Sequence, residues 1–417
     1  MLELKWIREN PDLVRAGLAA KSARLNLDEL LELDAKRRSL LTEVEQLKSR
    51  RNAANGEISR LKKEGRPPDA IITSMKETSQ KIKEIDGKVG ELSELIREII
   101  YIIPNIPDKS VPVSSAGAGN TVVRSWGETR KFSFKPKDHL QIGSELGWIS
   151  IERGSKIAGP GFPVYQGMGA RLERVLVNFM LDLHTKRHGY QEVWPPSLVN
   201  RASMTGTGQL PKFEEDMYRL KDDDLFLIPT SEVPVTNLLR DEVLEEKELP
   251  VRFTAYSPCF RREAGSYGKD TRGLSRVHQF DKVEMVKFVK PETSLDELES
   301  LVANAEAVLQ ALELPYRVVL LASGDMSFAA AKCYDLEVWA PGAEKWFEVS
   351  SCSAFGDFQA RRINIKFRRQ ATGKLELVHT LNGSGVALAR TVLCLLENFQ
   401  TVDGKVNFPK ALLPYLS

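Results

Sequence analysis

Charged and aromatic residues are concentrated in the segment 251–286, where the sequence predicts two β-strands. If residues 251–263 form a strand, its two-residue period places Arg261 and Glu263 on one face. The next strand then has a second mixed face, made of Arg276, His278, Phe280 and Glu284. Such faces make poor core surfaces, because burial of an unpaired charge costs several kcal/mol.

These residue types suit an anionic nucleotide. An arginine can hold a phosphate through two parallel hydrogen bonds, a phenylalanine can stack on a purine, and a carboxylate can accept from an exocyclic amine. A glycine-containing polar loop, residues 264–275, connects the two predicted strands. The pattern alone leaves one alternative open, a ladder of ion pairs on the protein surface.

Three other segments carry hydroxyl, carboxylate and amide groups. The segment 227–237 is expected to present a loop with Thr230, Ser231 and Glu232. The segment 346–353 has a carboxylate near two hydroxyls, at Glu348, Ser350 and Ser351. A carboxylate beside a hydroxyl predicts a site for magnesium on ATP phosphates, although such strings also occur as ordinary turns.

The segment 379–398 reads as a strand, a glycine turn and a helix, and carries Asn382, Ser384 and Arg390. Arg390 is expected inside an apolar helix, where an arginine needs an anion. The sequence leaves open whether that anion is a structural carboxylate or a ligand phosphate.

Other site chemistries are disfavoured. No phosphate-binding loop of the GxxxxGK[ST] type occurs, and the four cysteines lack the spacing of a disulfide framework or a zinc site. His184 and His188 are four residues apart, which permits a metal pair, but we expect surface histidines there. The start of the chain lacks the pattern of a signal peptide, and no apolar stretch is long enough for a membrane span, so we expect a cytoplasmic protein.

The composition of the 417 residues, 42% hydrophobic and 28% charged, indicates a soluble globular chain of two or three units. From about residue 121 short strands alternate irregularly with helices. This favours a mainly antiparallel sheet with helices packed on it, and hence an α+β fold. The strands are expected at 251–256, 277–289, 316–321, 334–340 and 363–369, and the helices at 171–187, 232–246 and 294–313.

The N-terminal region has heptad periodicity. A first helix is expected to begin at Asn10 with Pro11 in its first turn. From near Asp28, apolar residues recur every seven positions, at Leu33, Leu40, Leu47, Ala54 and Leu61, with interruptions at Arg37 and Arg51. A break at 65–70, with Asp69 as the new N-cap, precedes a second series, at Met75, Ile82, Val89, Ile96 and Ile103. Two such helices predict an antiparallel arm about 50 Å long.

The outer half of this arm is basic. Between residues 48 and 66, two acidic residues accompany seven basic ones, namely Lys48, Arg50, Arg51, Arg60, Lys62, Lys63 and Arg66. The net charge of the chain is only +2, so contact with nucleic acid must come from such local clusters. The stripe is either a solvated helix face or a grip on an RNA backbone.

Several strings carry a family resemblance. Residues 260–280, FRREAGSYGKDTRGLSRVHQF, resemble motif 2 of class II aminoacyl-tRNA synthetases, and residues 383–390, GSGVALAR, resemble motif 3. The whole chain resembles the bacterial-type seryl-tRNA synthetases. Further matching strings are 136–147, 188–200, 205–216, 230–237, 324–341 and 348–362.

The resemblance implies an α+β protein with an N-terminal antiparallel coiled-coil arm and a class II synthetase domain with a mainly antiparallel sheet flanked by helices. The expected boundaries are 1–103 for the tRNA-binding domain with its arm at about 28–103, 104–120 for a linker, and 121–417 for the catalytic domain. A homodimer is implied, with residues 189–196 at its interface. The implied reaction is activation of L-serine by ATP and transfer of the seryl group to serine tRNA.

The resemblance also assigns residues to roles. Arg261, Arg390 and Glu348 are implied to be catalytic. Contacts to ATP are implied for Arg261, Arg262, Glu263, Arg276, Val277, Phe280, Glu348, Val349, Ser350, Ser351 and Arg390. Contacts to serine are implied for Thr230, Ser231, Glu232, Arg261, Glu284, Asn382 and Ser384. The division of the substrate's ammonium and hydroxyl between the glutamates stays open.

The implied cofactors and partners follow from the same likeness. Mg²⁺ is expected with ATP on Glu348 and Ser351, and no zinc is expected, because the zinc-dependent archaeal ligand pattern is not apparent. The arm is expected to contact the long variable arm of serine tRNA through Lys48, Arg50, Arg51, Arg60, Lys62 and Lys63. Whether selenocysteine tRNA is also charged stays open. The competing hypotheses are a relative that loads serine on another acceptor, a catalytically silent RNA-binding protein, and a structural coiled-coil protein.

Overall fold

The computed structural model describes residues 1–264 and 273–416. The chain divides into two compact units. One contains Leu2–Ala19 and Ala23–Ile103, and the other contains Met1, Ala20–Ser22 and the chain from Pro104 onward. In the described part of the chain, no helix has the length and apolar character that crossing a membrane requires.

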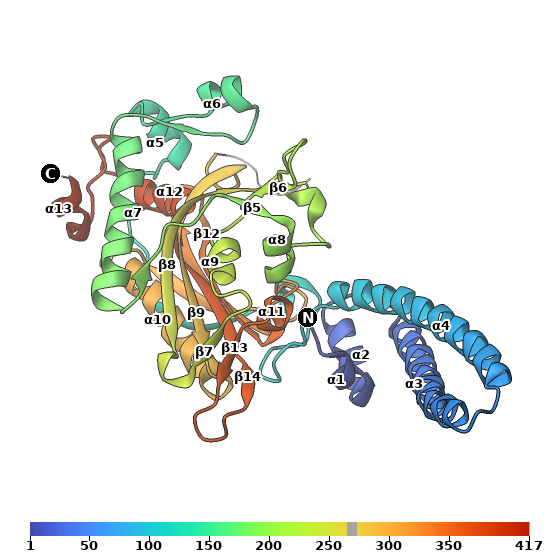
Figure 1. The fold of residues 1–417 in the computed structure, drawn as a ribbon. Coiled ribbons are helices and arrows are strands. Elements are labelled where there is room, and N and C mark those ends of the chain that lie inside the picture. Colours follow the sequence, from blue (N-terminus) through green and yellow to red (C-terminus); the bar gives the residue numbers. More distant parts are fainter. Residues whose placement is uncertain (265–272, 417) are drawn as a thin grey trace. The chain divides into compact units, whose positions relative to one another are not determined.

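The first unit is helical (Figure 1) and contains α1 (Leu4–Glu9), α2 (Pro11–Ala20), α3 (Leu27–Lys63) and α4 (Asp69–Ile102). The helix predicted at Pro11 is confirmed, whereas α1 was not predicted. The N-cap predicted at Asp69 is wrong by one residue: Pro68 caps α4, and its carbonyl accepts from the amides of Ile71 and Ile72.

The long helices form the predicted antiparallel pair. Ile82 of the heptad series is buried between them together with Val44 and Ile85, and Leu40, Leu47 and Val89 of the series pack against this cluster. Ion pairs cross the seam from Glu43 to Lys81, at 2.7 Å, and from Lys48 to Asp86, at 3.3 Å. The local periodicity therefore predicted both the helices and the face that each buries.

A buried carboxylate explains the first interruption of the heptads. Asp34 is fully buried in α3 and forms ion pairs with Arg8, Arg37 and Arg38 at 2.9, 3.3 and 3.0 Å. Burial would raise the pKa of Asp34, but the hydrogen bonds from the three guanidinium groups lower it on balance. Arg37 thus lies near the seam because it serves Asp34, and Arg8 fixes α1 to the base of α3.

The second unit is built on an eight-stranded sheet in the order β1-β10-β11-β12-β15-β9-β8-β4. Its strands are β1 (Thr121–Trp126), β10 (Tyr316–Leu320), β11 (Lys332–Ala340), β12 (Lys345–Gly356), β15 (His379–Ala387), β9 (Gln279–Val289), β8 (Val251–Phe260) and β4 (Gln191–Glu192). The edge strand β4 pairs with β8 in parallel, and the other pairings are antiparallel. The predicted α+β class with a mainly antiparallel sheet is confirmed.

Helices and short strands complete this unit. The helices are α5 (His139–Glu145), α6 (Ile151–Ala158), α7 (Met168–Arg187), α8 (Arg201–Thr207), α9 (Glu232–Asn237), α10 (Ser294–Ala311), α11 (Phe358–Ile363), α12 (Leu388–Asn398) and α13 (Leu413–Leu416). Small sheets join β14 (Leu375–Leu377), β13 (Lys366–Arg368) and β7 (Val243–Glu245), β2 (Ile149–Ser150) and β3 (Val164–Tyr165), and β5 (Leu198–Asn200) and β6 (Leu225–Leu227). The 3₁₀ turns are Ala116–Gly119, Glu214–Asp216, Glu246–Glu248, Pro291–Thr293 and Lys410–Leu412.

The main core lies between the sheet and three helices. Leu176 of α7, Leu301 of α10 and Leu393 of α12 are fully buried against strand residues such as Met285 and Leu336. Burial of large aliphatic side chains on this scale supplies the main driving force for folding of the unit. The packing fixes the central strands, whose ends and exposed side chains form the candidate site.

Three further sequence predictions, of elements in the second unit, are wrong. The helix predicted over 232–246 ends at Asn237, because the chain turns at Asp241, with φ of 64°, and then forms β7. The strand predicted over 363–369 covers only 366–368, because α11 ends at Ile363 and a left-handed residue follows. The glycine turn predicted after residue 379 is part of β15.

The glycines of β15 serve close packing. A Cβ atom at Gly383 would lie 2.7 Å from the Cys352 sulfur, and one at Gly385 would lie 2.6 Å from the His184 ring. A turn signal and a close-contact signal use the same residue type, so the sequence alone did not separate them.

Candidate active site

The sheet carries a cavity of about 620 Å³. It lies over strands β9, β12 and β15 and the start of α12, which all contribute lining residues. The predicted site residues that line it are Thr230, Glu232, Arg261, Glu263, Arg276, Val277, Phe280, Glu284, Glu348, Val349, Ser350, Ser351, Asn382, Ser384 and Arg390. Segments more than 150 residues apart in sequence, from Thr230 to Arg390, therefore meet around one cavity.

Two predicted residues do not line the cavity. The Arg262 side chain is exposed and donates to the carbonyl of Glu215 at 2.9 Å. Ser231 is fully buried, and its hydroxyl hydrogen-bonds with the hydroxyl of Ser257.

The arginine end of the cavity is made by segments outside the strands. β8 ends at Phe260, so the prediction that Arg261 and Glu263 alternate along a strand is wrong. Glu263 has a φ of 53° and forms an ion pair with Arg276, which precedes β9. The ion pair brings together residues that are 13 positions apart in the sequence, and both line the cavity.

Arg261 is held beside an aromatic ring. Its guanidinium carbon lies 5.2 Å from the centre of the Phe280 ring, and its Nε donates to the carbonyl of Pro229 at 3.3 Å. His278, predicted on the same face as Phe280, instead stacks on Phe162, and its Nδ1 donates to the carbonyl of Arg261. This end of the cavity thus combines a cation with an apolar ring face, which suits a nucleotide.

Arg390 lies in the first turn of α12 and joins two walls of the cavity. Its Nε donates to the carbonyl of Ser275 at 2.9 Å, and Nη1 donates to the carbonyl of Glu348 at 2.7 Å. The Glu348 carboxylate is 3.3 Å from Nη1. The structural partner that the sequence left open is therefore present, and the guanidinium also faces the cavity.

Below Glu348 and Ser351 lies a buried acid that the sequence did not indicate. Asp335 of β11 pairs with Ser351 of β12 in the sheet register. Burial raises the pKa of Asp335 well above its usual range, and the charge of Glu348 raises it further. The Ser351 hydroxyl lies 3.2 Å from the sulfur of Cys333. Asp335 is therefore a buried carboxyl group, with its pKa raised, close to the predicted magnesium ligands.

The other end of the cavity is a buried polar network on the central strands. Glu284 of β9 is 1% exposed and forms an ion pair with Lys282. Asn382 of β15 donates to Glu284 Oε1 at 3.1 Å, and Thr230 donates to Oε2 at 3.3 Å. Lys282 Nζ also lies 2.7 Å from the Thr230 hydroxyl. Every member of this network is a hydrogen-bonding group of fixed position.

Glu232 begins α9 beside this network rather than lying in the predicted loop. Burial raises its pKa to about 7, and the nearby charge of Glu284 contributes. Gln359 donates to Glu232 Oε1 at 2.7 Å, and the Thr380 hydroxyl donates to the Gln359 oxygen at 2.7 Å. The last bond fixes the amide so that its nitrogen faces Glu232.

The two histidines do not behave as predicted. His184 is fully buried, so its prediction as a surface residue is wrong, and its Nδ1 is 3.0 Å from Nδ1 of His188. Burial lowers the pKa of His184 to about 3, so the ring is neutral. Within residues 1–264 and 273–416, no three His, Cys, Asp or Glu residues are grouped as metal ligands.

The predicted RNA-contacting residues lie on α3. Lys48 forms the ion pair with Asp86, and Arg60 lies 3.9 Å from Glu57 and 3.8 Å from Glu64. Arg50, Lys62 and Lys63 are exposed, and Arg51 is half-buried.

Comparison with known proteins covers both units. Residues 1–107 match the seryl-tRNA synthetase N-terminal domain, and residues 212–399 match the class II core domain of the tRNA synthetases for G, H, P, S and T. The serine–tRNA ligase of Chloroherpeton thalassium is 54% identical over 100% of this chain and 99% of its own length. The chain belongs to the seryl-tRNA synthetase family.

Solved structures of seryl-tRNA synthetases share the fold. The enzyme from Pyrococcus horikoshii, complexed with ATP, has a TM-score of 0.94 and 38% identity, and covers 100% of this chain and 98% of its own. The cytoplasmic serine–tRNA ligase of Naegleria fowleri, in complex with AMP, has a TM-score of 0.90 and 30% identity, with 100% and 97% covered. The likeness therefore extends over the entire chain.

Sequence reasoning missed several residues of this candidate site. Lys282 shares the cavity face of β9 with Phe280 and Glu284, so period-two alternation carried the signal that could have found it. Gln359 and Asp335 carried no local signal, because each reaches the site through a contact between segments distant in sequence.

Proposed function

We propose that the protein activates L-serine with ATP to form seryl-adenylate and transfers the seryl group to the 3′ end of serine tRNA. One observation carries this proposal: a single cavity joins an arginine-lined end containing Phe280 to a small, fully hydrogen-bonded polar end around Glu284. The first end suits a nucleotide triphosphate, and the second suits a small amino acid with a hydroxyl group.

The chemistry needs positioning and charge neutralisation rather than a protein nucleophile. In the first step a carboxylate oxygen of serine attacks the α-phosphorus of ATP, and the bond to pyrophosphate breaks. In the second step a ribose hydroxyl of the terminal nucleotide attacks the seryl carbonyl, and AMP leaves. Arg261 would hold the α-phosphate, and Arg276 and Arg390 the outer phosphates, while Glu263 would meet the adenine amino group and Phe280 its ring.

Glu348 and Ser351 fit a hard cation bound together with phosphates, because both present oxygen atoms to the cavity. Mg²⁺ there would neutralise phosphate charge, with the remaining ligands supplied by ATP and water. The proposal includes no zinc. All four cysteines are free and buried, which supports a reducing, cytoplasmic location.

Selection of serine would rest on the polar end. Thr230, Glu232, Glu284, Asn382 and Ser384 supply donors and acceptors around a small volume. A site that hydrogen-bonds a hydroxyl rejects alanine, because its buried polar groups are then left without partners. Threonine would be excluded by crowding.

The proposed organisation has a tRNA-binding domain at 1–103, a linker at 104–120 and a catalytic domain at 121–417. The exposed basic residues of α3 support a grip on the tRNA backbone. We place a homodimer interface at 189–196, where Trp194 is 79% exposed.

The test is amino-acid-dependent ATP–pyrophosphate exchange with magnesium, using serine, threonine, alanine and glycine. Exchange with serine alone is the expected result. If the protein is folded and binds RNA but shows no pyrophosphate exchange with any of the four amino acids, the result would favour the hypothesis of a catalytically silent RNA-binding protein.

A second assay separates the arm from the active site. The triple variant Arg50→Gln, Lys62→Gln, Lys63→Gln should leave serine-dependent exchange unchanged and weaken charging of serine tRNA roughly tenfold or more, because phosphate contacts are lost. The matched control is Lys5→Gln, a lysine of α1 outside the arm. Unchanged charging by the triple variant at physiological salt would contradict the role of the arm.

A further inference from the structure

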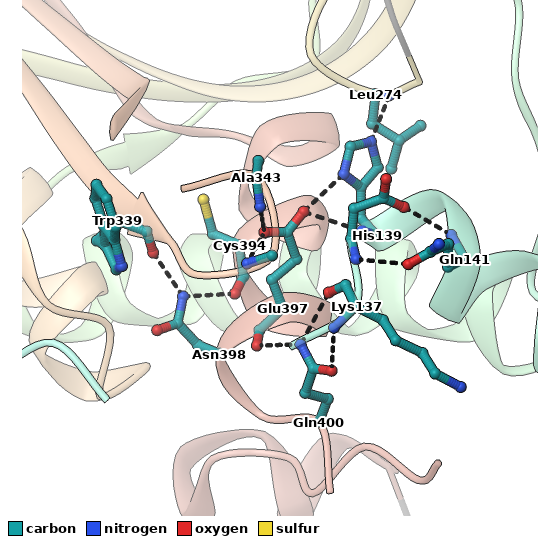
Figure 2. Close-up of polar contacts among 12 residues, drawn as sticks. Lys137, His139, Gln141, Leu274, Trp339, Ala343, Cys394, Glu397, Asn398 and Gln400 are labelled. Atoms are coloured by element: carbon teal, nitrogen blue, oxygen red, sulfur yellow. Dashed lines mark hydrogen bonds and ion pairs between the residues drawn. The ribbon is translucent and has the colours of Figure 1, made fainter. Parts of the chain in front are cut away.

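A buried histidine and a buried glutamate hydrogen-bond to each other beside Leu274, a residue of the cavity lining (Figure 2). His139 is the first residue of α5, and Glu397 lies in the last turn of α12. They are 5% and 0% exposed. None of the roles described above involves either residue.

Glu397 receives four N–H donors (Figure 2). Oε1 accepts from the backbone amide and the Nδ1 of His139, at 3.0 and 2.9 Å. Oε2 accepts from the amides of Gly342 and Ala343, both at 2.9 Å. Because a carboxylate oxygen accepts, the contact at Oε1 requires that His139 carry a proton on Nδ1.

The opposite side of the histidine ring faces the cavity wall. The amide of Leu274 points to His139 Nε2, at 3.2 Å, so Nε2 acts as an acceptor. The acceptor beside Nδ1 and the donor beside Nε2 fix one tautomer of the ring, with hydrogen on Nδ1 and a lone pair on Nε2. The ring therefore transmits the position of Glu397 to the backbone at Leu274.

The segment that begins at Leu274 carries groups of the arginine end of the cavity, where we propose that ATP binds and which we call the ATP end. Leu274, Ser275 and Arg276 all line the cavity, and Ser275 supplies the carbonyl that accepts from Arg390. Because Arg390 and Glu397 belong to the same helix, α12 holds this segment at two points: directly at Ser275, and through His139 at Leu274.

Gly273 indicates how tightly the ring is fitted. Its φ is 66°, and a Cβ atom there would lie 2.3 Å from His139 Nε2. Any side chain at this position would displace the ring and break its hydrogen bond to Leu274. The glycine thus permits the backbone to approach the imidazole.

We propose that His139, oriented by Glu397, is a positioning residue for the ATP end of the cavity, where it fixes the segment 274–276 so that Arg276 and the Arg390 anchor lie in place for the phosphates. This inference rests on the proposed function for its kinetic readout. A purely structural role for the pair would instead stabilise α5 and α12 without distinguishing ATP from serine.

Two amide substitutions separate these roles. His139→Asn keeps a donor near the position of Nδ1, toward Glu397, and removes the acceptor for Leu274. His139→Gln keeps an acceptor near the position of Nε2, toward Leu274, and weakens the contact to Glu397, which retains its three backbone donors. If His139 positions the segment 274–276, the His139→Gln variant should keep a KM for ATP closer to wild type than the His139→Asn variant does. If His139 only supports the structure, the order of the two variants should be reversed.

The experiment measures KM for ATP and for serine in pyrophosphate exchange, together with thermal unfolding. In His139→Asn we expect KM for ATP to rise roughly tenfold, the effect of about one hydrogen bond, with KM for serine within about twofold of wild type. In His139→Gln we expect KM for ATP within about threefold. Equal shifts in both KM values, or better ATP binding by Asn than by Gln, would overturn the proposal.

Gly273→Ala keeps both side chains of the pair and gives an independent variant should His139→Asn fail to fold. It should raise KM for ATP to a similar extent, and an unchanged value would also overturn the proposal. Calorimetric binding of a non-hydrolysable ATP analogue to wild type and variants needs no serine chemistry. A protein with no exchange activity but with weaker analogue binding by His139→Asn would contradict the proposed function while supporting the role of His139.

Discussion

The two ends of the cavity are constructed differently. The polar end, where we propose that serine binds and which we call the serine end, consists largely of buried side chains on β9 and β15 that hydrogen-bond to one another, with Glu284 at their centre. The ATP end, where the arginines lie and where we propose that ATP binds, consists of side chains from segments beside the strands, such as Arg261, anchored largely to backbone carbonyl groups. Substitutions at the serine end should therefore damage folding and catalysis together, whereas those at the ATP end should damage catalysis alone.

The largest effect is expected at Arg261. Because Arg261 is exposed and lies after the end of β8, Arg261→Ala should leave the free energy of unfolding within about 0.5 kcal/mol of wild type. Loss of a cation that stabilises phosphate charge should lower kcat/KM for serine-dependent exchange about a thousandfold. Arg261→Lys, which keeps the charge and loses the planar fork, is the control and should recover only part of the activity. A large loss of stability in the alanine variant would contradict the comparison.

Glu284→Gln should have the next largest effect, and on both properties. The change leaves Lys282 charged in a buried position, which should lower the free energy of unfolding by roughly 3 kcal/mol. KM for serine should rise about a hundredfold, while KM for ATP in the residual activity stays near its wild-type value. Denaturant unfolding and exchange kinetics on the same samples test this. A Glu284→Gln variant of normal stability but without activity would contradict the comparison, because the two ends would then respond to substitution in the same way.

The pH dependence of stability gives a further test of the buried polar end, through Glu232. Its pKa is raised from an ordinary 4.5 to about 7, so the folded protein binds this proton more tightly than the unfolded chain. The resulting stability is fully present below pH 4.5 and is lost as pH rises to about 7. Glu232→Gln keeps a neutral side chain at every pH, so its stability relative to wild type should increase between pH 5 and 7 by on the order of 2 kcal/mol. Unfolding at pH 5, 6, 7 and 8 measures this difference, and a constant difference would show that Glu232 is not buried as an acid.

Asp335→Asn should have the smallest effect. Asp335 is buried beneath the ATP end, and burial raises the pKa of its carboxyl group, which favours the neutral form. The amide is neutral and of similar size, so we expect exchange within about threefold of wild type and a stability change of less than about 1 kcal/mol. The magnesium concentration for half-maximal exchange should stay within about twofold. A strong dependence on this carboxylate would mean that it is charged when magnesium and ATP are bound.

The sequence predicted what depends on residues close along the chain. Heptads gave the antiparallel α3–α4 pair, and alternation gave the cavity face of β9 at Phe280 and Glu284. Site residues within recognisable strings, such as Arg390, were also predicted and line the cavity. The strand order and the turns at Asp241 and Asn364 depend on backbone conformation and tertiary pairing, which short patterns do not encode.

The supporting residues were harder to predict for a physical reason. Gln359 acts on Glu232 across 127 positions of sequence, and His139 acts on Leu274 across 135. Their importance lies in what they hold, and an isolated glutamine or histidine in a sequence gives no indication of its partner. Only the assembled sheet and helices bring each one to its target.

The ion pairs of Asp34 have a mechanical consequence for the long arm. From Asp34 to Lys63, α3 extends about 45 Å, so one degree of bending at the base moves the far end by about 0.8 Å. The three ion pairs that Asp34 forms with Arg8, Arg37 and Arg38 resist bending at this base. The reach of the tip is thus governed by a single buried carboxylate, remote from the basic residues near the tip.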